Sequence, residues 1–276
     1  MGSRQSASAL RLDSIPMDPA SLAIVLPAYN EEARLGAGLD ELFAWLEGDE
    51  ARAALPASVH VLVVDDGSTD GTAAIVHHRR EARGGDGVPP RLSVVSVPHG
   101  GKGAAVRAGM VASEADLVVF ADADMATPPG QLAPLVAALR DHDVALGSRI
   151  QPDGSDMRAT QPLFRRLLGR AFHLLASAWV VGPVEDTQCG FKGFRREAAH
   201  DLFRRQRVTS IVFDVEIIYL ARARGYSIAI VPIRWSDRRG SRMHPGPGLA
   251  LRVAWDLFRI PLIHRSEGRR PARGGG

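Results

Sequence analysis

The sequence predicts an α/β fold in which a mainly parallel sheet carries helices on both faces. In the first 150 residues, short runs rich in β-branched residues alternate with amphipathic helical patterns, which is typical of such a sheet. The chain has 276 residues, of which 45% are hydrophobic and 24% charged, so it can bury a full core. The expected strands are 22–26, 59–64, 92–97, 117–121 and 144–147.

A helix is expected directly after the first strand. Asn30 is a typical N-cap residue, and Glu31 and Glu32 follow it at the positive end of the helix dipole. The glycine- and proline-rich segment 84–91 is interpreted as a linker inside the domain, because strands are expected on both sides of it. Apolar residues of the first helix recur at helical spacing and should form one buried face: Leu35, Leu39, Leu42, Phe43 and Leu46.

The second half of the chain is less regular. A strand is expected at 227–233, and a last helix at about 249–260, where polar residues form one narrow stripe among apolar ones. This last helix is either a core helix or a helix that lies in a membrane interface, and the basic residues behind it favour the interface. The polar stripe consists of Arg252, Asp256 and Arg259. Further helices are expected at about 162–181, 195–205 and 212–224.

Charge is distributed unevenly along the chain. The formal net charge is only +3, but arginine is concentrated in the second half, which indicates an anionic partner, either nucleic acid or a membrane surface. No stretch reaches the roughly 18 to 20 apolar residues that a membrane-spanning helix needs. The nearest candidate, 162–181, contains Arg165, Arg166 and Arg170, each costing about 2.5 to 3.5 kcal/mol near the bilayer centre. We therefore expect a protein that lies on a membrane rather than crossing it.

The opening segment and the single cysteine add two expectations. The first 18 residues contain no apolar run, so we expect a disordered leader rather than a signal peptide. Cys189 is the only cysteine and cannot form an internal disulfide, which fits a reducing compartment. We expect it to be a small buried thiol.

Polar residues follow four of the expected strands at the point where each strand ends. In open α/β sheets, ligands bind beyond the carboxyl ends of the strands. Asp122 and Asp124 follow the fourth strand and are separated by one residue, so both carboxylates should point the same way. Such a pair can share a divalent cation, Mg²⁺ or Mn²⁺, with a diphosphate. The other three strand ends carry PAYNE (27–31), DDGS (65–68) and GGKG (100–103).

The glycine segment 100–103 fits neither of the familiar nucleotide-binding patterns. A P-loop would need glycine at Ser96 and a hydroxyl residue at Gly103, and a dinucleotide fingerprint would need glycine at Val106. An ATPase or an NAD enzyme is therefore disfavoured. Lys102 should instead meet a donor phosphate or a carboxylate, unless the segment is only the first turn of a helix.

Seven motifs stand in order along the chain: LPAYNEEARL, VVDDGSTDGT, GGKGAAVRAGM, FADADMAT, LGSR, EDTQCGFKGF and FDVEIIYLARARGY. Together they resemble the motifs of dolichyl-phosphate β-glucosyltransferases and their prokaryotic relatives. These enzymes are family 2 glycosyltransferases with the GT-A fold, a Rossmann-like, mixed, mainly parallel sheet. The resemblance covers about 21–260, and its specificity lies in the combination, because the first two motifs occur throughout the family.

The resemblance implies roles in binding a sugar-nucleotide donor. Lys102 and Gly103 would lie near the donor phosphates. The metal and the diphosphate would be held by Asp122, Ala123 and Asp124. The base and ribose of the donor would lie against Pro27, Ala28, Tyr29, Glu31 and Asp66.

The resemblance also implies roles on the acceptor side. Arg149 would contact phosphate, because a planar guanidinium can donate to two phosphate oxygens at once. Arg165 or Arg166 would bind the acceptor phosphate, unless both belong to a solvated helix face. Asp186 and Lys192 would lie beside the reacting centre.

The function implied is inverting transfer of a sugar, glucose from UDP-glucose, onto a polyprenyl or dolichyl monophosphate. One alternative is a dolichyl-phosphate mannose synthase that uses GDP-mannose. Another is transfer to a different lipid or to a soluble acceptor, and a third is a nucleotide-sugar-binding regulator without turnover. Binding to nucleic acid is not expected, because the arginines lack the interleaved exposed aromatics of a stacking platform.

The resemblance also implies the organisation and location of the protein. Eukaryotic members typically begin with a membrane-spanning helix, and we expect none in this sequence, so membrane contact should come from 162–181 and 249–264. We expect a peripheral protein on the cytoplasmic face of a membrane. The expected parts are a disordered leader (1–20), a GT-A domain (21–235) with a donor-binding half (21–150) and an acceptor half (151–235), a region of amphipathic interface helices (236–264), and a disordered basic tail (265–276).

Overall fold

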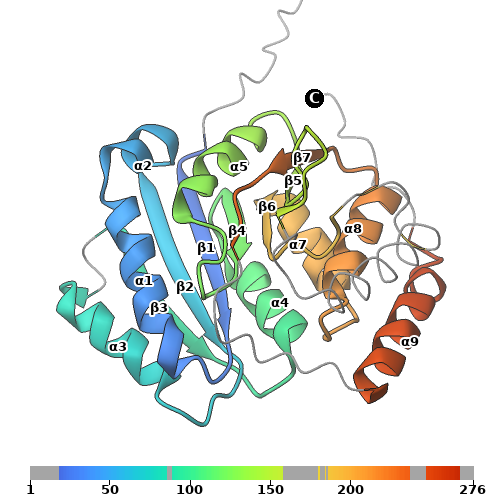
Figure 1. Ribbon diagram of the computed structural model, residues 1–276, viewed down its shortest axis with the longest axis horizontal. Helices are drawn as coiled ribbons and strands as arrows, with labels where there is room; N and C mark the ends of the chain where they lie inside the picture. The colour runs from blue at the N-terminus through green and yellow to red at the C-terminus, as the bar shows by residue number, and fades with distance from the viewer. Residues whose placement is uncertain are drawn as a thin grey trace, which may run out of the picture.

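The computed structural model describes residues 19–85, 89–157, 180, 184, 186–236 and 247–267 (Figure 1). Within these residues the strands form one seven-stranded sheet with the order β3-β2-β1-β4-β6-β5-β7. β6 runs antiparallel to its neighbours β4 and β5, and the other pairs are parallel. The predicted mixed, mainly parallel sheet is therefore confirmed. The strands are β1 (Ser21–Ala28), β2 (Ser58–Asp65), β3 (Arg91–Ser96), β4 (Leu117–Ala121), β5 (Val144–Ser148), β6 (Phe191–Arg195) and β7 (Ile228–Pro232).

Six of these strands were predicted from the sequence, and β6 was not. Its sequence, FKGFR, contains no β-branched residue, and it includes lysine and glycine, which are depleted in strands. It becomes a strand because two neighbours supply hydrogen-bonding partners. Phe194 pairs with Val118 of β4 on one side and with Val144 of β5 on the other.

The sheet buries a hydrophobic core on each face, because side chains alternate along each strand. Ile24 and Leu26 of β1 face the core beneath α1, α3 and α5, whereas Ala23 and Val25 face the core beneath α4, α7 and α8. Full burial of one large aliphatic side chain contributes about 1.5 to 3 kcal/mol. Figure 1 shows α1 and α3 on one side of the sheet and α4, α7 and α8 on the other. The helices are α1 (Glu32–Leu46), α2 (Asp49–Ala54), α3 (Thr72–Ala82), α4 (Lys102–Ala112), the 3₁₀ helix η2 (Pro129–Gln131), α5 (Leu132–Ala138), α7 (Arg196–Arg205), α8 (Phe213–Ala223) and α9 (Pro247–Ile263).

The start of α1 differs from the prediction. Glu31, not Asn30, is the N-cap residue, and the N-cap prediction for Asn30 is wrong. Asn30 has a positive φ of 52°, and its side-chain oxygen accepts a hydrogen bond of 2.8 Å from the backbone N–H of Thr69. Asn30 therefore ties the end of β1 to the loop after β2. The predicted apolar face of α1 is confirmed, because all five of its members are buried: Leu35, Leu39, Leu42, Phe43 and Leu46.

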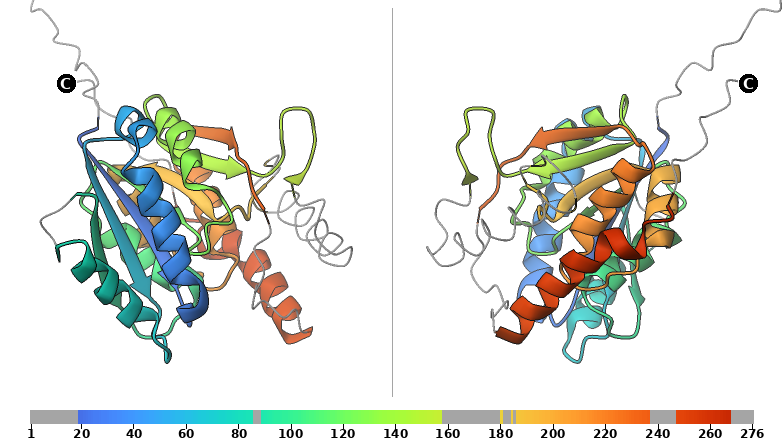
Figure 2. Two further views of the ribbon diagram at one scale, coloured as in Figure 1. Left: turned by 60° about the vertical axis from the view of Figure 1, so that its left-hand side comes forward. Right: turned by 90° about the vertical axis from the view of Figure 1, so that its right-hand side faces the viewer.

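Helix α9 crosses the face formed by α7 and α8 (Figure 2). It is longer than the helix predicted at 249–260, and it buries Leu257 and Ile260 against the protein. Asp256, which was expected in a polar stripe, is also buried. Its carboxylate is satisfied there by a hydrogen bond of 2.6 Å from the Ser210 hydroxyl. No helix among the described residues is long and apolar enough to cross a bilayer.

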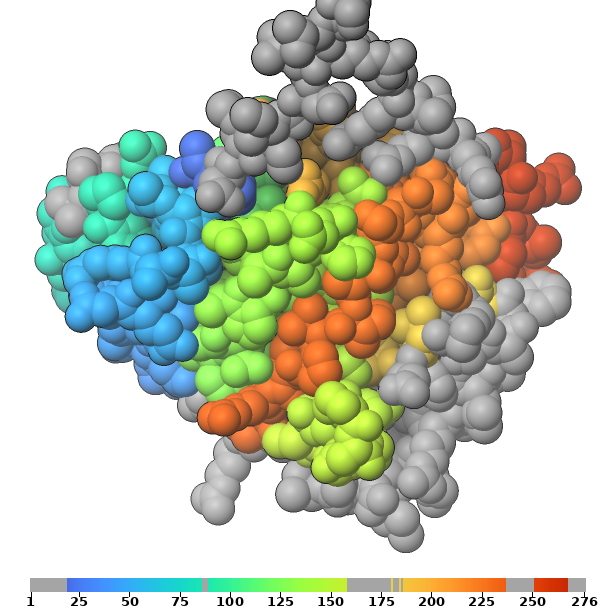
Figure 3. All heavy atoms as spheres, turned by 90° about the horizontal axis from the view of Figure 1, so that it is seen from above, coloured from blue at the N-terminus to red at the C-terminus, as the bar shows by residue number. Residues whose placement is uncertain are grey.

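Strand β7 returns the chain to the sheet after α8. It pairs with β5, and Figure 3 shows its segment packed against the green segments of α5 and β5. The chain beyond β7 continues to Ser236, whose N–H donates to the Ala126 carbonyl oxygen at 2.9 Å. The segment therefore reaches the loop after β4. The helix predicted at 162–181 lies outside the described residues except for Val180, and so do 1–18 and 268–276 of the predicted termini.

Candidate active site

The predicted site residues come together at one edge of the sheet. The parallel strands β1, β2, β4 and β5 all end at this edge, whereas the antiparallel β6 begins there, with Ala121 of β4 opposite Phe191. The segment before β6 is therefore placed beside the residues that follow β4. This arrangement brings Gly190 and its neighbours to Asp122.

The Asp66 carboxylate holds the glycine loop that begins α4. Asp66 is buried, and its two oxygens accept hydrogen bonds from the N–H groups of Gly100 (2.8 Å) and Gly101 (2.9 Å). Gly101 has a φ of 94°, a left-handed conformation that favours glycine. Asp66 was predicted to line the donor pocket, and in the structure its carboxylate faces this loop.

A stacked aromatic pair lies beside Asp66. The Tyr29 and His99 rings are 4.2 Å apart at an angle of 24°, and Tyr29 is 42% exposed. His99 Nδ1 lies 2.9 Å from the Asp66 carboxylate, which orients the ring. Sequence reasoning missed His99, and its position between β3 and the glycine loop was the available signal. The pair offers a flat surface on which a nucleotide base can stack.

Asp122, Ala123 and Asp124 form the DAD motif, and each of its two carboxylates faces a basic side chain. Lys102 Nζ lies 2.6 Å from Asp122 Oδ1, and Arg34 Nη1 lies 3.6 Å from Asp124 Oδ2. Arg34 is held by two hydrogen bonds to the Glu31 carboxylate, at 2.8 and 2.6 Å. Arg34 was not predicted, and it links Glu31 to the DAD motif. Burial would lower the pKa of Lys102, but Asp122 above all raises it, so this amine stays charged at neutral pH.

Burial raises the pKa of Asp124 above its usual value, and the negative charge of Asp122 raises it further. The two carboxylates therefore repel each other, and the charges of Lys102 and Arg34 offset part of this repulsion. The residues fit a hard divalent cation, because Mg²⁺ in particular is held by one or two carboxylates together with phosphate and water oxygens. No cluster of three or more metal-ligating side chains exists among the described residues. A cation here would depend on oxygens from a bound diphosphate.

Three predicted donor residues are buried at the edge of the site. Ala28 and Ala123 are 3% and 6% exposed, and the carbonyl oxygen of Ala123 packs against Gly38 of α1. The Gly103 N–H donates to the Thr209 carbonyl oxygen at 3.0 Å. These residues shape the site from beneath. Pro27, in contrast, is half-buried where β1 ends.

The segment before β6 packs directly on the DAD motif. A Cβ atom at Gly190 would lie 2.3 Å from Asp122 Oδ2, so only glycine permits this approach. Cys189 is 1% exposed, which confirms the predicted buried thiol, and burial raises its pKa to about 12.

Lys192 lies beneath the surface of the site. It is 0% exposed, and its amine donates to Asp214 Oδ1 at 2.6 Å and to the Cys189 carbonyl oxygen. Burial raises the pKa of Asp214, although the Lys192 and Lys102 charges act in the opposite direction. The lysine predicted beside the reacting centre therefore contacts Asp214, the first acidic residue of the motif FDVEIIYLARARGY. Sequence reasoning assigned no role to Asp214.

Arg149 is fixed on two sides. Its Nε and Nη2 groups each donate to the Asp186 carboxylate at 2.7 Å, and its guanidinium lies 5.6 Å from the centre of the Trp235 ring. The Asp186 side chain is 1% exposed. Asp186 is therefore placed to orient Arg149. Arg165 and Arg166 lie outside the described residues.

Comparison with known proteins places this site in an established family. The model of the family "Glycosyl transferase family 2" matches residues 23–203. The chain is 37% identical to a dolichyl-phosphate beta-glucosyltransferase of Drosophila melanogaster over 248 residues, which cover 87% of this chain and 74% of the fly protein. It is 36% identical to the Homo sapiens protein of the same name over 232 residues, covering 81% and 70%.

A solved structure has the same fold. Glucosyl-3-phosphoglycerate synthase from Mycobacterium tuberculosis, in complex with Mn²⁺, uridine diphosphate and glucosyl-3-phosphoglycerate, superposes with a TM-score of 0.57 at 22% identity. The match covers 92% of this chain and 82% of that protein. The family model spans most of the described sheet, and the relatives are more than 30% identical to this chain. This chain therefore belongs to glycosyl transferase family 2.

Proposed function

We propose that this glycosyltransferase moves glucose from UDP-glucose onto a polyprenyl monophosphate of the dolichyl type, with inversion at the anomeric carbon. The observation that carries the proposal is the pairing of Asp122 and Asp124 with Lys102 and Arg34 at the strand ends, the same edge of the sheet at which Asp186 fixes Arg149. The names of the fly and human relatives support the choice of sugar and acceptor.

The donor half of the site binds the nucleotide and its diphosphate. Tyr29 and His99 stack against the base. Asp122 and Asp124 hold a divalent cation, which when bound neutralises charge that develops on the leaving diphosphate. The Mn²⁺ in the mycobacterial synthase supports a divalent ion, and Mg²⁺ would bind the same oxygens. Lys102 remains protonated and adds positive charge at the same place.

The acceptor half positions a phosphate monoester. Asp186 occupies the Nε and Nη2 groups of Arg149, and Nη1 has no partner among the described residues, so it is available to a phosphate oxygen. The second pKa of a phosphate monoester is about 6, so the attacking oxygen is already largely ionised at neutral pH. The reaction therefore needs orientation more than a strong general base. Asp186 serves as the positioning residue for Arg149.

We further propose that the protein associates peripherally with the cytoplasmic face of a membrane. One face of α9 is fixed to the protein, while the opposite face presents apolar side chains to solvent. We call these side chains the apolar stripe, and they recur at helical spacing over three turns. An exposed stripe of this kind suits the boundary between head groups and acyl chains, where a polyprenyl phosphate is anchored. The stripe consists of Leu251 (74% exposed), Trp255 (61%), Phe258 (49%) and Leu262 (50%).

Transfer of label tests the proposed reaction. The full-length protein is incubated with radiolabelled UDP-glucose, a polyprenyl phosphate and Mg²⁺, and GDP-mannose is tested in parallel. The expected product is an acid-labile labelled lipid formed from UDP-glucose. Label found only in a water-soluble product would replace the lipid acceptor with a soluble one. Absence of transfer from either donor to any acceptor would indicate a binding protein.

A further inference from the structure

A cavity of about 600 Å³ has none of the candidate active-site residues in its lining, although Gln206 and Thr209 of that lining hydrogen-bond to Gly103 of the glycine loop. Helix α4, the end of α7, the segment that follows it and the chain after α9 all contribute to its walls. Its lining is dominated by guanidinium groups, so we call it the arginine cavity. The guanidinium groups belong to Arg107, Arg204, Arg205 and Arg207. Glu267 is the only acidic residue of the lining.

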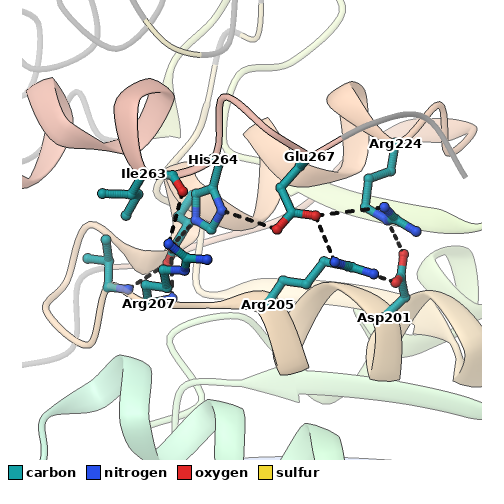
Figure 4. Close-up of polar contacts among 9 residues, drawn as sticks. Asp201, Arg205, Arg207, Arg224, Ile263, His264 and Glu267 are labelled. Atoms are coloured by element: carbon teal, nitrogen blue, oxygen red, sulfur yellow. Dashed lines mark hydrogen bonds and ion pairs between the residues drawn. The ribbon is translucent and has the colours of Figure 1, made fainter.

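One wall of the arginine cavity is electrically balanced. Figure 4 shows Arg205 and Arg224 alternating with Asp201 and Glu267. Arg205 lies 3.0 Å from Asp201 and 2.7 Å from Glu267, and Arg224 contacts the same two carboxylates. Two positive charges therefore meet two negative charges. The Glu267 carboxylate is engaged in this wall and does not offset the remaining arginines.

The other three arginines have no ion pair in the part of the chain that the structure describes. Arg107 donates to the Phe203 carbonyl oxygen and Arg207 to the Ile263 carbonyl oxygen, each at 3.0 Å, and both acceptors are neutral. Arg204 is exposed and belongs to the lining. Three uncompensated positive charges thus line one hollow and repel one another. A multiply charged anion relieves this repulsion, and guanidinium groups favour phosphate oxygens.

The backbone around the arginine cavity is held rigidly. The Glu216 carboxylate accepts hydrogen bonds of 2.8 Å from the N–H groups of Arg207 and Val208, and His264 Nε2 contacts it at 2.6 Å. The Gln206 amide donates to the carbonyl oxygens of Gly103 and Val208, at 2.9 and 2.7 Å. The guanidinium groups therefore extend from a fixed frame, which lowers the entropy that a ligand must overcome.

We propose that the arginine cavity is a phosphate-binding site, separate from the site of sugar transfer. The shared chemistry is a phosphate group with more than one negative charge, carried by a lipid head group or by a soluble phosphate. The lipid source is favoured by position, because Arg207 contacts the carbonyl oxygen of Ile263, the residue after the last member of the apolar stripe, Leu262.

Direct binding to the full-length protein tests this site with two probes. Inorganic phosphate is titrated in solution by calorimetry, and vesicles of phosphatidylcholine with and without phosphatidic acid are tested by co-sedimentation. The Arg107→Gln/Arg204→Gln/Arg207→Gln variant should bind at least one probe about tenfold or more weakly, because each lost charged hydrogen bond costs about tenfold. The matched control, Arg52→Gln/Arg91→Gln/Arg222→Gln, removes the same charge from exposed arginines elsewhere and should change affinity less than about twofold.

A variant with a single substitution is tested as well, in case the triple variant does not fold. Arg204 makes no ion pair among the described residues, so Arg204→Glu should fold normally and still weaken binding about tenfold. Loss of vesicle binding alone identifies a lipid head group, and loss of phosphate binding identifies a soluble ligand. The proposal is overturned if the wild type binds neither probe, or if both arginine-cavity variants bind as tightly as the control. Failure of glucose transfer would not affect this result, because turnover is not measured.

Discussion

Arg149 and Asp186 form a side-on pair, with two parallel hydrogen bonds of 2.7 Å between the guanidinium and the carboxylate. Asp186 also accepts the backbone N–H of Arg149 at 2.9 Å, so the carboxylate fixes both the main chain and the side chain of one residue. Burial would lower the pKa of Arg149, but Asp186 raises it more, and the guanidinium stays charged. A phosphate that meets Arg149 therefore meets a group whose orientation is already set.

Asp186→Asn should impair acceptor binding more than donor binding. The amide cannot accept both guanidinium hydrogen bonds, so Arg149 loses its fixed orientation, and the acceptor KM should rise about tenfold or more. Calorimetric titration of UDP should show little change. An equal loss of UDP affinity would assign Arg149 to the donor diphosphate instead.

Asp122→Asn and Asp124→Asn should each lower kcat about 10²- to 10³-fold, because each removes a carboxylate that holds charge-stabilising groups at the diphosphate. The fold should survive, since the two side chains are 38% and 25% exposed. EDTA should inactivate the wild type to a similar extent. Asp49→Asn, at an exposed position, is the matched control and should retain activity. Full activity of both variants in EDTA would remove the cation from the mechanism.

Asp201→Asn should destabilise the protein at neutral pH by about 1 to 3 kcal/mol, because it weakens charged hydrogen bonds to Arg224 and Arg205. Burial raises the pKa of Asp201, but Arg224, Tyr226 and Arg205 lower it more, so the net shift is downward from 3.8.

The sign of this shift predicts a pH dependence. A carboxyl group with a lowered pKa in the folded state stabilises the protein above pH 3.8 and loses this effect as the pH falls through the folded value. Urea unfolding at several pH values should therefore show the wild type and Asp201→Asn converging in strong acid. The exposed control Asp141→Asn should match the wild type throughout. A gap between Asp201→Asn and the wild type that is constant with pH would contradict the assignment.

The apolar stripe of α9 should drive binding to anionic vesicles. Trp255→Ser/Phe258→Ser removes two exposed aromatic side chains, each of which can bury about 150 to 250 Å². Co-sedimentation should fall about tenfold or more, and high salt should release only part of the wild type, because salt screens arginine but not apolar contact. Val95→Ser/Ile230→Ser alters two exposed apolar residues elsewhere and is the control. Equal binding by both variants would exclude the stripe.

The features of this protein that depend on local pattern could be predicted from its sequence. Strands β1, β2, β4 and β5 are mainly apolar runs, and the edge strand β3, RLSVVS, still contains a leucine and two valines. A buried strand needs little more than such a run between turns. The ends of these strands carry PAYNE, DDGS, GGKG and the DAD motif, so the position of the site followed from the rule that parallel strands end at one edge. The buried face of α1 followed from helical periodicity in the same way.

Tertiary structure alone decided the contacts that join distant segments. β6 has a weak local preference, and only its pairing between β4 and β5 makes it a strand and brings Gly190 against Asp122. The partnership of Lys192 with Asp214 and the stacking of His99 on Tyr29 likewise join residues from different elements. No periodicity encodes such pairs, because the free energy of a buried charge or a ring contact depends on which groups the fold brings within a few ångströms.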